Sequence, residues 1–406
     1  MNAQGDFDGE YPVTKKAIPE ATPGARLAES SQETELSRRN LIRGAGIIGA
    51  AALVAACDSG AETKGSGGPA ILSKKRNLKM VTSWPKNFPG TGTGAARLAK
   101  RIEDLSDGQI KIKVYAAGEL VGALECFDAV SEGKADMYHA AEYYWQGKSP
   151  AFNFFAAVPM GMTANEITAW IRFGGGQELW DELSGGFNVK PLLGGNTGTQ
   201  MGGWFQKEIN SIEDFQGLRI RMPGLGGEVM RRVGATPVTK QVGEIFQALS
   251  QGNIDATEWI GPWNDLAFGF HTIVKKYYYP GIHEPGTALG FGTNLDLWQE
   301  LSPKERNIFE NAAMAENDYM YSEFNANNAH ALDTLINEHG VELLRFSDDI
   351  LAKLAVVSAE VVADVANADE LTKRVYDSFM DARRGSMQWG SISEQAFMNA
   401  RSLAEI

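Results

Sequence analysis

Residues 110–140 read IKIKVYAAGELVGALECFDAVSEGKADMYHA, and the spacing of their apolar residues indicates the fold class. Apolar and polar residues alternate over residues 110–115, a spacing that predicts a β-strand. The spacing changes over residues 122–132 to that of an amphipathic helix, and residues 137–140 again read as a short strand. Strand, helix and strand in succession predict an α/β fold in which helices cover the faces of a sheet.

The alternation of strands and helices continues on both sides of this stretch. Toward the N-terminus, the pattern predicts a strand at residues 78–84 and a helix at residues 94–105. A second series contains a strand at 218–222, helices at 226–233 and 243–251, and a short strand at 254–259. With 43% apolar residues, about 330 folded positions provide a large core, and that length predicts two lobes.

The C-terminal region, residues 303–406, is predicted to be almost wholly helical. Its apolar residues recur at helical spacing, first through Phe309, Ala313, Met320 and Phe324. We expect these long, charged helices either to brace both lobes or to join two subunits, and residues 350–400 are the candidate surface for a homodimer.

Residues 37–57, SRRNLIRGAGIIGAAALVAAC, read as an export signal. Paired arginines precede a modestly apolar run, which is typical of twin-arginine export, and Cys57 completes a lipoprotein-type cleavage site. The run from Gly44 to Ala56 has 13 residues, fewer than the roughly 20 that a membrane-spanning helix needs. A buried helix rich in alanine and glycine is the alternative interpretation.

The signal predicts a periplasmic protein whose mature part begins at Cys57, with a lipid anchor there, or just after it. Residues 1–57 form the signal, and residues 58–76, rich in glycine and serine, form a flexible tether. Acylation of Cys57 would leave Cys126 without a partner, so the mature chain is predicted to contain no disulfide.

The net charge of −13 at pH 7 argues against two classes of partner. Nucleic-acid phosphates and anionic lipid headgroups repel so acidic a chain. We therefore expect no nucleic-acid partner and no binding to an anionic membrane surface.

The sequence contains only weak matches to catalytic motifs. Residues 90–95, GTGTGA, match a loose dinucleotide-binding fingerprint, but residues 85–89 separate the glycines from the preceding strand. A glycine-rich loop bordering a cleft is the better interpretation. Cys126 lies in an apolar helix pattern, and no G-x-S-x-G motif occurs. Each histidine is interpreted as structural, because none has metal-ligand spacing: His139, His271, His283, His330 and His339.

Polar and aromatic residues gather at two predicted strand ends. In GLRIRMPG, residues 217–224, alternation puts Arg219 and Arg221 on one face of the strand. An arginine at a strand end can grip a carboxylate through two parallel hydrogen bonds. In SQGNIDATEWIG, residues 250–261, a helix, a glycine turn and a short strand deliver Glu258 and Trp259 to a second strand end.

These motifs together resemble those of the solute-binding proteins of tripartite ATP-independent periplasmic (TRAP) transporters, of the DctP-like family. The resemblance covers the chain from Lys79 to about Phe346. Its landmarks are KMVTSWPKNFPGTG, IKVYAAGELVGALECFDAVSEGKADMYHAAEYYW, GLRIRMPG, GATPV and GEIFQALSQGNIDATEW. It implies a two-lobed periplasmic binding protein fold with a hinge and a helical C-terminal region, and it implies no enzymatic activity.

The chain most resembles the subgroup that binds 2-oxo acids, lactate or similar monocarboxylates together with a metal ion. The arginine that holds the ligand carboxylate in this subgroup falls on Arg221, with Arg219 as the alternative. The tyrosine of the first lobe that closes over the ligand falls on Tyr143 or Tyr144. Trp259 is expected to contact the ligand as well.

The resemblance also implies a metal site. Its ligands fall on Gln200, Glu258 and Trp259, of which Gln200 and Glu258 also help hold the ligand, and Glu284 completes the shell. Glutamine, glutamate and a backbone carbonyl supply only oxygen, so the cation is expected to be Na⁺ or Ca²⁺ rather than zinc. No organic cofactor is expected.

The resemblance implies a mechanism in which the protein binds its ligand without breaking a bond. Residues 77–197 with about 285–330 form one lobe, and residues 198–284 with about 331–406 form the other. The lobes close by hinge motion where the chain crosses near residues 194–198 and 283–290, and they deliver the acid to TRAP permease subunits. Two alternatives remain open: an exported cofactor enzyme that uses the twin-arginine route, and a sensory lipoprotein with the same fold.

Overall fold

The computed structural model of the chain describes residues 74–404. The predicted signal, residues 1–57, and most of the predicted tether, residues 58–76, therefore lie outside the described residues. Tether and fold meet at Arg76, where the first strand begins.

Two sheets organise the described residues. The first has the strand order β2 (Ile110–Tyr115), β1 (Arg76–Thr82), β3 (Met137–Ala140), β10 (Ala288–Asn294), β4 (Val189–Asn196). Strand β1 runs parallel to both β2 and β3, whereas β10 runs antiparallel to β3 and β4. The first lobe is therefore a mixed sheet.

The second sheet has six strands. Their order is β11 (Glu342–Arg345), β9 (Lys276–Tyr279), β5 (Gly203–Phe205), β8 (Ala256–Thr257), β6 (Arg219–Arg221), β7 (Thr236–Val238). Strands β8, β6 and β7 are parallel, so their carboxyl ends lie on one edge of the sheet.

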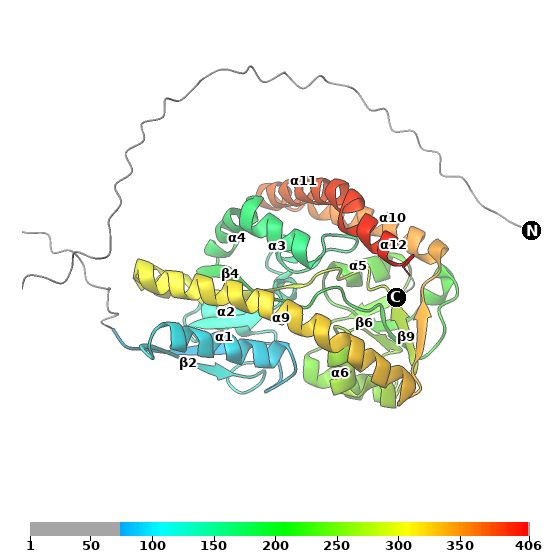
Figure 1. Cartoon of the computed structure of the whole chain (residues 1–406), viewed down its shortest axis with the longest axis horizontal. Helices are drawn as coiled ribbons and strands as arrows, with labels where there is room; N and C mark the ends of the chain where they lie inside the picture. The colour runs from blue at the N-terminus through cyan, green and yellow to red at the C-terminus, as the bar shows by residue number, and fades with distance from the viewer. Residues whose placement is uncertain (1–73, 405–406) are drawn as a thin grey trace, which may run out of the picture. The chain divides into compact units, whose positions relative to one another are not determined.

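Helices cover both sheets, as the alternating pattern predicts (Figure 1). Those before the second sheet are α1 (Thr91–Leu105), α2 (Cys126–Ser131), α3 (Ala164–Phe173), α4 (Gly176–Gly185) and the 3₁₀ helices η1 (Glu142–Trp145) and η2 (Pro150–Phe155). The others, up to the last strand, are η3 (Ile212–Phe215), α5 (Gly224–Arg232), α6 (Val242–Ser250), α7 (Pro262–Phe268), η4 (Phe270–Thr272), α8 (Leu295–Glu300) and α9 (Pro303–Asn337). The chain ends in α10 (Asp348–Val365), α11 (Glu370–Ile392) and α12 (Glu394–Arg401). The α/β expectation is confirmed.

Residues 110–140 form the two predicted strands, but their helix is shorter than predicted. Strands β2 and β3 have the expected bounds. The expected helix at residues 122–132 is shorter, because α2 begins only at Cys126. The Glu125 carboxylate accepts a hydrogen bond from the Gly122 backbone N–H at 3.0 Å. This contact holds residues 122–125 in a turn ahead of the helix.

Helices α3 and α4 were not predicted, although the sequence carries a start signal for α3. Thr163 and Glu166 form a capping box, in which each side chain bonds the other's backbone N–H. This S/T-x-x-E spacing marks a helix N-terminus. Trp170 of α3 and Trp180 of α4 both stack on Phe155, at centroid distances of 5.3 and 5.2 Å. The two helices thus close the aromatic core of the first lobe.

The chain passes between the sheets at the two places expected and also through a long helix. Strand β4 leads into β5, and β9 leads back into β10, with Asn196 paired to Ala288 where these crossings run side by side. The third connection is α9, which packs on β4 and α1 of the first lobe and on α7 of the second. Figure 1 shows it as the yellow to orange helix that runs past both lobes.

The predicted apolar stripe of α9 is buried. Phe309, Ala313, Met320 and Phe324 are each at most 2% exposed. Ser302 caps the helix, its hydroxyl accepting from the Glu305 backbone N–H, and Pro303 stands at the first helical position. The helical prediction for the C-terminal region is confirmed, apart from strand β11, which continues the second sheet.

The C-terminal helices touch both lobes. Helix α10 packs on α5, whereas α11 packs on α3, α4 and η2. Figure 1 shows α11 in red beside α3 and α4. Phe379 of α11 lies edge-on to Trp170 at 5.2 Å. Large apolar side chains beyond this contact are exposed, among them Trp389, Ile392 and Phe397. Among the described helices, none is long and apolar enough to cross a membrane.

Candidate ligand and metal site

The candidate site begins at the carboxyl ends of two neighbouring parallel strands. Arg221 is the last residue of β6, and its register partner on β8 is Thr257. Glu258 and Trp259 follow directly. Open α/β sheets bind ligands beyond the carboxyl ends of their strands, so these side chains stand at the usual place for a ligand.

Arg221 and Glu258 form a buried ion pair. Arg221 Nη1 donates to Glu258 Oε1 and, at 3.3 Å, to the Glu258 backbone carbonyl, and both side chains are 1% exposed. The guanidinium also lies 5.1 Å from the centre of the Trp259 ring. Taking two charges out of water is unfavourable, and the pair offsets part of that penalty in this structure.

Two further titratable side chains surround Glu258. His283 Nε2 lies 3.4 Å from Glu258 Oε2, and a ligand atom from each of Glu258, His283 and Glu284 lies within 4.8 Å of the other two. Burial raises the pKa of Glu284 to about 7, and the neighbouring Glu258 carboxylate adds to that rise. Burial alone would lower the pKa of His283, but the Glu258 and Glu284 carboxylates raise it above its usual value. The cluster can therefore hold positive charge.

Gln200 ties the site to the two crossings between the sheets. Its Nε2 donates to the hydroxyls of Thr197 and Thr287, at 3.1 and 3.0 Å. The Thr287 hydroxyl in turn donates to Glu284 Oε2 at 2.5 Å. The predicted metal ligands Gln200 and Glu284 are thus linked through one threonine.

Several buried polar atoms of this site lack a hydrogen-bond partner. They are Gln200 Oε1, Glu258 Oε2, Arg221 Nε, Trp259 Nε1 and His283 Nε2. Buried polar atoms are nearly always hydrogen-bonded, so each such atom needs an explanation, of which an ion is one. The two oxygens suit a hard cation, and the arginine and tryptophan N–H groups suit a carboxylate. The donor set fits a metal ion together with an anionic ligand.

A small cavity lies against this cluster. It encloses ≈ 230 Å³, including space open to solvent, and is lined by Trp84, Tyr143, Tyr144, Thr197, Gln200, Trp259, Ile260, Thr287 and Leu289. Its interior has room for about one water molecule, so the cavity is nearly closed in this structure. Burial raises the pKa of Tyr144 to about 12 and raises that of Tyr143 well above its usual value, so both hydroxyls stay protonated.

The structure places the predicted site residues in two adjoining groups. Tyr143, Tyr144, Gln200 and Trp259 border the cavity. A second group, Arg221, Glu258 and Glu284, is buried beside it. Tyr144 and Tyr143 face the charged group closely enough that the Arg221 charge acts on the pKa of both hydroxyls.

Arg219, the alternative carboxylate clamp, lies elsewhere. Its guanidinium forms a two-pronged pair with Asp255, with Nε 2.9 Å from Oδ2, and its side chain is 47% exposed. The alternation argument treated the two arginines as equivalent, but only Arg221 reaches the buried strand end. Arg219 has a structural partner of its own.

His283, Thr197 and Thr287 were missed by the sequence interpretation. His283 was assigned a structural role, yet it contacts Glu258. Its position next to Glu284, inside a predicted crossing between lobes, was the available signal. The threonines lie in the same two crossings, where their short spacing to Gln200 and Glu284 carried no recognisable motif.

The glycines of residues 90–95 serve helix packing. Helix α1 begins at Thr91, and a Cβ at Gly94 would lie 2.3 Å from Met320 Cε of α9. The helix start is therefore covered by α9. Cys126 is buried, and burial raises its thiol pKa to about 12, which keeps it protonated and unreactive.

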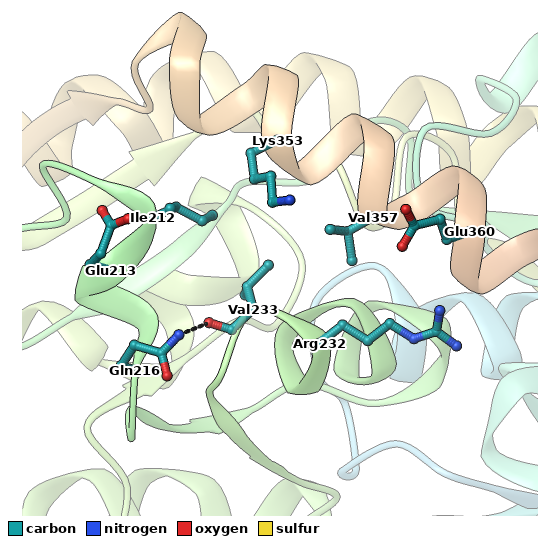
Figure 2. Close-up of a pocket in the computed structure, with 8 residues that line it drawn as sticks. All are labelled: Ile212, Glu213, Gln216, Arg232, Val233, Lys353, Val357 and Glu360. Carbon is teal, nitrogen blue, oxygen red and sulfur yellow. Dashed lines mark hydrogen bonds between the residues drawn. The ribbon is translucent and has the colours of Figure 1, made fainter.

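A separate groove lies on the second lobe, between η3, α5 and α10 (Figure 2). It measures ≈ 700 Å³ including open solvent. The Gln216 side-chain amide donates to the Val233 carbonyl at 3.0 Å on one wall, and Lys353 extends from the other. None of the predicted site residues lines this groove.

Helix η1, which carries the two tyrosines, also carries a buried acid. The Tyr138 hydroxyl donates to Glu142 Oε1 at 2.7 Å, and burial raises the pKa of Glu142 to about 8. A Cβ at Gly290 would come within 2.1 Å of that oxygen, so the neighbouring strand requires glycine there. The Glu142 carboxyl group is therefore protonated at neutral pH.

We expect Glu142→Gln to stabilise the protein increasingly as pH rises. The folded pKa lies above that of the unfolded chain, so the wild type loses stability between about pH 4.5 and 8, by at most about 1.4 kcal/mol per pH unit. Glutamine keeps the acceptor without titrating. Thermal unfolding at pH 5 and pH 8 measures the difference, with the exposed Glu178→Gln as control. Equal shifts at both pH values would contradict the assignment.

Comparison with known proteins identifies the family. Residues 80–369 match the family described as bacterial extracellular solute-binding protein, family 7, or DctP. A monocarboxylate 2-oxoacid-binding periplasmic protein of Nostoc sp. is 37% identical over 370 residues, which are 91% of this chain and 100% of the relative.

Two solved structures share the fold. A TRAP transporter solute-binding protein of Bordetella bronchiseptica RB50, a dimer with calcium and picolinate bound, has a TM-score of 0.80 and 32% identity over 81% of this chain and 98% of that one. A TRAP periplasmic solute-binding protein of Pseudoalteromonas atlantica T6c, with bound sodium and pyruvate, has a TM-score of 0.78 and 36% identity over 80% and 99%. The two-lobed fold is confirmed. The chain belongs to family 7 of the bacterial extracellular solute-binding proteins, the DctP family, and is a TRAP-type solute-binding protein.

Proposed function

We propose that this chain captures a small monocarboxylate, such as pyruvate, another 2-oxo acid or a lactate-like acid, together with a bridging metal cation. It then delivers the acid to the membrane permease of a TRAP transporter. The observation that carries the proposal is the group of unpartnered buried donors and acceptors around Glu258. The ligands of the relatives, 2-oxoacids in one and pyruvate with sodium in another, support it.

In this proposal Arg221 holds the carboxylate of the acid. Its Nε has no partner, and it is the buried arginine at the strand end. Trp259 Nε1 is a second free donor beside the same position. Tyr143 and Tyr144 cover the ligand from the first lobe.

The cation lies among Gln200, Glu258, Glu284 and the backbone carbonyl of Trp259. Gln200 Oε1 and Glu258 Oε2 are the oxygens of this group that lack a hydrogen-bond partner. Without a cation, a bound carboxylate would face Glu258 at low dielectric, and this repulsion would amount to several kcal/mol. Sodium and calcium accept such oxygen ligands, and both occur in the relatives' sites.

Binding closes two lobes about the crossings. We assign residues 77–197 with about 285–330 to the first lobe and residues 198–284 with about 331–406 to the second. Strand membership of the two sheets supports this division. The cavity lined from both lobes supports closure around the ligand.

Two measurements test the proposal. Mass spectrometry of small molecules released from the denatured protein should find a monocarboxylate. Calorimetry should then detect pyruvate binding in sodium or calcium and much weaker binding after chelation in a potassium buffer. Absence of binding to every 2-oxo acid and 2-hydroxy acid tested would overturn the ligand class.

We infer that the protein is not an enzyme, because its family and its neighbours serve transport. The family comparison does not favour an exported cofactor enzyme. A flavin, haem or iron–sulfur absorbance band in the purified protein would contradict this inference. The absence of a permease gene beside the gene for this protein would instead favour a sensory lipoprotein.

The protein is periplasmic in this proposal, exported by the twin-arginine route and anchored at Cys57. The membership of a periplasmic solute-binding family supports the compartment. Replacing Arg38 and Arg39 by lysine should retain the precursor in the cytoplasm. Labelling with a fatty-acid analogue tests the anchor, with Cys57→Ser as the negative control.

We further propose a homodimer through the C-terminal helices. Trp389, Ile392 and Phe397 are 68%, 73% and 64% exposed on α11 and α12. Clusters of exposed large apolar residues mark interaction sites. Trp389→Ser with Ile392→Ser should convert a dimer into a monomer in light scattering, whereas the exposed Phe173→Ser should leave the mass unchanged. A monomeric wild type would overturn the proposal.

A further inference from the structure

An aromatic contact joins a loop of the first lobe to the strand end of the second. Phe88 lies in the loop after β1 of the first sheet, and Trp259 follows β8 of the second sheet. The Phe88 ring meets the Trp259 ring edge-on at a centroid distance of 6.3 Å, and it lies 4.9 Å from the ring of Phe268 in α7. Three rings from two lobes thus pack together, and the Phe88 ring is partly buried there.

A hydrogen bond joins the same two segments. The Asn264 side-chain amide of α7 donates to the Pro89 carbonyl at 3.1 Å, and Asn264 is fully buried. Both contacts lie apart from the two chain crossings at residues 194–198 and 283–290. Because no chain connection passes through them, they can separate when the lobes open about the crossings.

The loop that carries Phe88, residues 85–90, is held against the start of α1. The Phe88 N–H donates to the Pro85 carbonyl at 3.2 Å, and the Phe88 carbonyl accepts from the Thr93 N–H at 3.0 Å. A Cβ at Gly92 would lie 2.5 Å from the Pro85 carbonyl oxygen, so this close approach requires glycine. The Phe88 ring is therefore held in a fixed position on the first lobe.

Phe88 touches the ligand site only through Trp259. The residues that line the ligand cavity include Trp259 but not Phe88. The Trp259 ring lies 5.1 Å from the Arg221 guanidinium, and its Nε1 is one of the buried donors without a partner. A ring of the first lobe therefore rests on the second-lobe residue that stands beside the carboxylate clamp.

We infer that Phe88 is a positioning residue that holds the closed lobes together and keeps Trp259 in place over the bound acid. Closure brings the Phe88 ring onto Trp259 and Phe268, and opening separates them. The closed state is stabilised by this contact, so the contact prolongs the time that the acid stays bound. The inference rests on the proposed carboxylate-binding function and adds a residue that controls the rate of release.

Stopped-flow tryptophan fluorescence tests the inference. Pyruvate is mixed with the protein in calcium, and the dependence of the observed rate on pyruvate concentration gives the association and dissociation rate constants. Phe88→Ala should raise the dissociation rate constant about 5- to 150-fold, because two aromatic pairs are lost from the closed state. The association rate constant should stay within about twofold, since the open state lacks the contact. Unfolded protein lowers the amplitude of the signal but changes neither rate constant.

The choice of acid distinguishes a positioning residue from a wall of the ligand cavity. Because Phe88 does not line the cavity, Phe88→Ala should speed the release of pyruvate and of 2-oxobutanoate by the same factor. A ring that touched the acid would affect the two unequally.

Three further variants serve as controls. Phe88→Tyr keeps the ring and should keep the slow release. Phe173→Ala removes a ring that is 90% exposed on α3 of the same lobe, and it should change neither rate constant. Phe268→Ala removes a partner ring in the second lobe, so its combination with Phe88→Ala should speed release by less than the product of the two single effects.

Two kinds of outcome would overturn the inference, and they are distinguishable. If Phe88→Ala leaves the dissociation rate constant unchanged, affects the two acids unequally, or multiplies fully with Phe268→Ala, Phe88 does not hold the lobes closed, while the proposed function stands. If the wild type binds neither acid in sodium or calcium, the proposed function fails and the inference fails with it.

Discussion

Arg221→Met is expected to abolish carboxylate binding. The arginine is 1% exposed and lies at the strand end, where its free Nε and a second N–H can form two parallel bonds to an anion. Truncating one partner of a buried, hydrogen-bonded charge pair weakens binding by about 2–5 kcal/mol, which is about 30-fold to several-thousand-fold. Calorimetry with pyruvate in the presence of calcium measures the loss.

Arg219→Met is the matched control. Its guanidinium is paired with Asp255 on the surface, and exposed ion pairs contribute about 0–1 kcal/mol. Pyruvate affinity should stay within about twofold of the wild type. The assignment of the clamp would be wrong if Arg219→Met abolished binding and Arg221→Met did not.

Arg221→Met also leaves Glu258 buried without its arginine partner, and the loss of one partner of a buried ion pair destabilises a fold by about 3–5 kcal/mol. The double variant with Glu258→Gln separates the two effects. It should recover most of the thermal stability, because no buried charge remains unpaired. It should recover none of the carboxylate affinity.

Glu258→Gln alone is expected to remove the dependence of binding on the cation. Glu258 stands at the centre of the buried cluster with His283 and Glu284. Even partners outside the coordination shell lower metal affinity about 10- to 100-fold when removed, so the loss of a direct ligand should exceed about 100-fold. Titration of calcium into the acid-free protein, followed by tryptophan fluorescence, reports this loss without the acid.

Glu244→Gln, on the exposed face of α6, is the control for charge alone. It removes the same formal charge and should leave calcium affinity unchanged. Pyruvate binding by the wild type that is equally tight with and without cation would contradict the bridging ion. In that case the unpartnered oxygens of Gln200 and Glu258 would need another occupant.

Local patterns predicted much of the fold. The strand bounds of β2 and β3 follow from alternation and from turn residues, both of which act within a few positions. Helices α3 and α4 were missed because their core contacts are aromatic stacks with Phe155 and with Phe379, which is some 200 residues away in sequence. Such packing produces no periodic pattern of apolar residues within the sequences of α3 and α4.

The site was predictable residue by residue but not as a network. The strand end and the family resemblance pointed to Arg221 and Glu258, and their proposed roles stay predictions. Alternation could not separate Arg219 from Arg221, because it indicates which face of the strand a side chain lies on. It does not indicate how deeply each position along the strand is buried. The contact of His283 with Glu258 arises from a chain crossing, so no spacing along the sequence revealed it.

The continuous helix α9 has a mechanical consequence for the proposed closure. Two bodies joined by one linker can twist, slide and bend independently, but these lobes are joined by two chain crossings that run side by side and by one unbroken helix that packs on both. Three connections couple the rotations, so that bending about the crossings remains the accessible degree of freedom. A permease that contacts both lobes would then detect one variable, the angle between the lobes. That angle would have one value in the empty protein and another in the occupied protein.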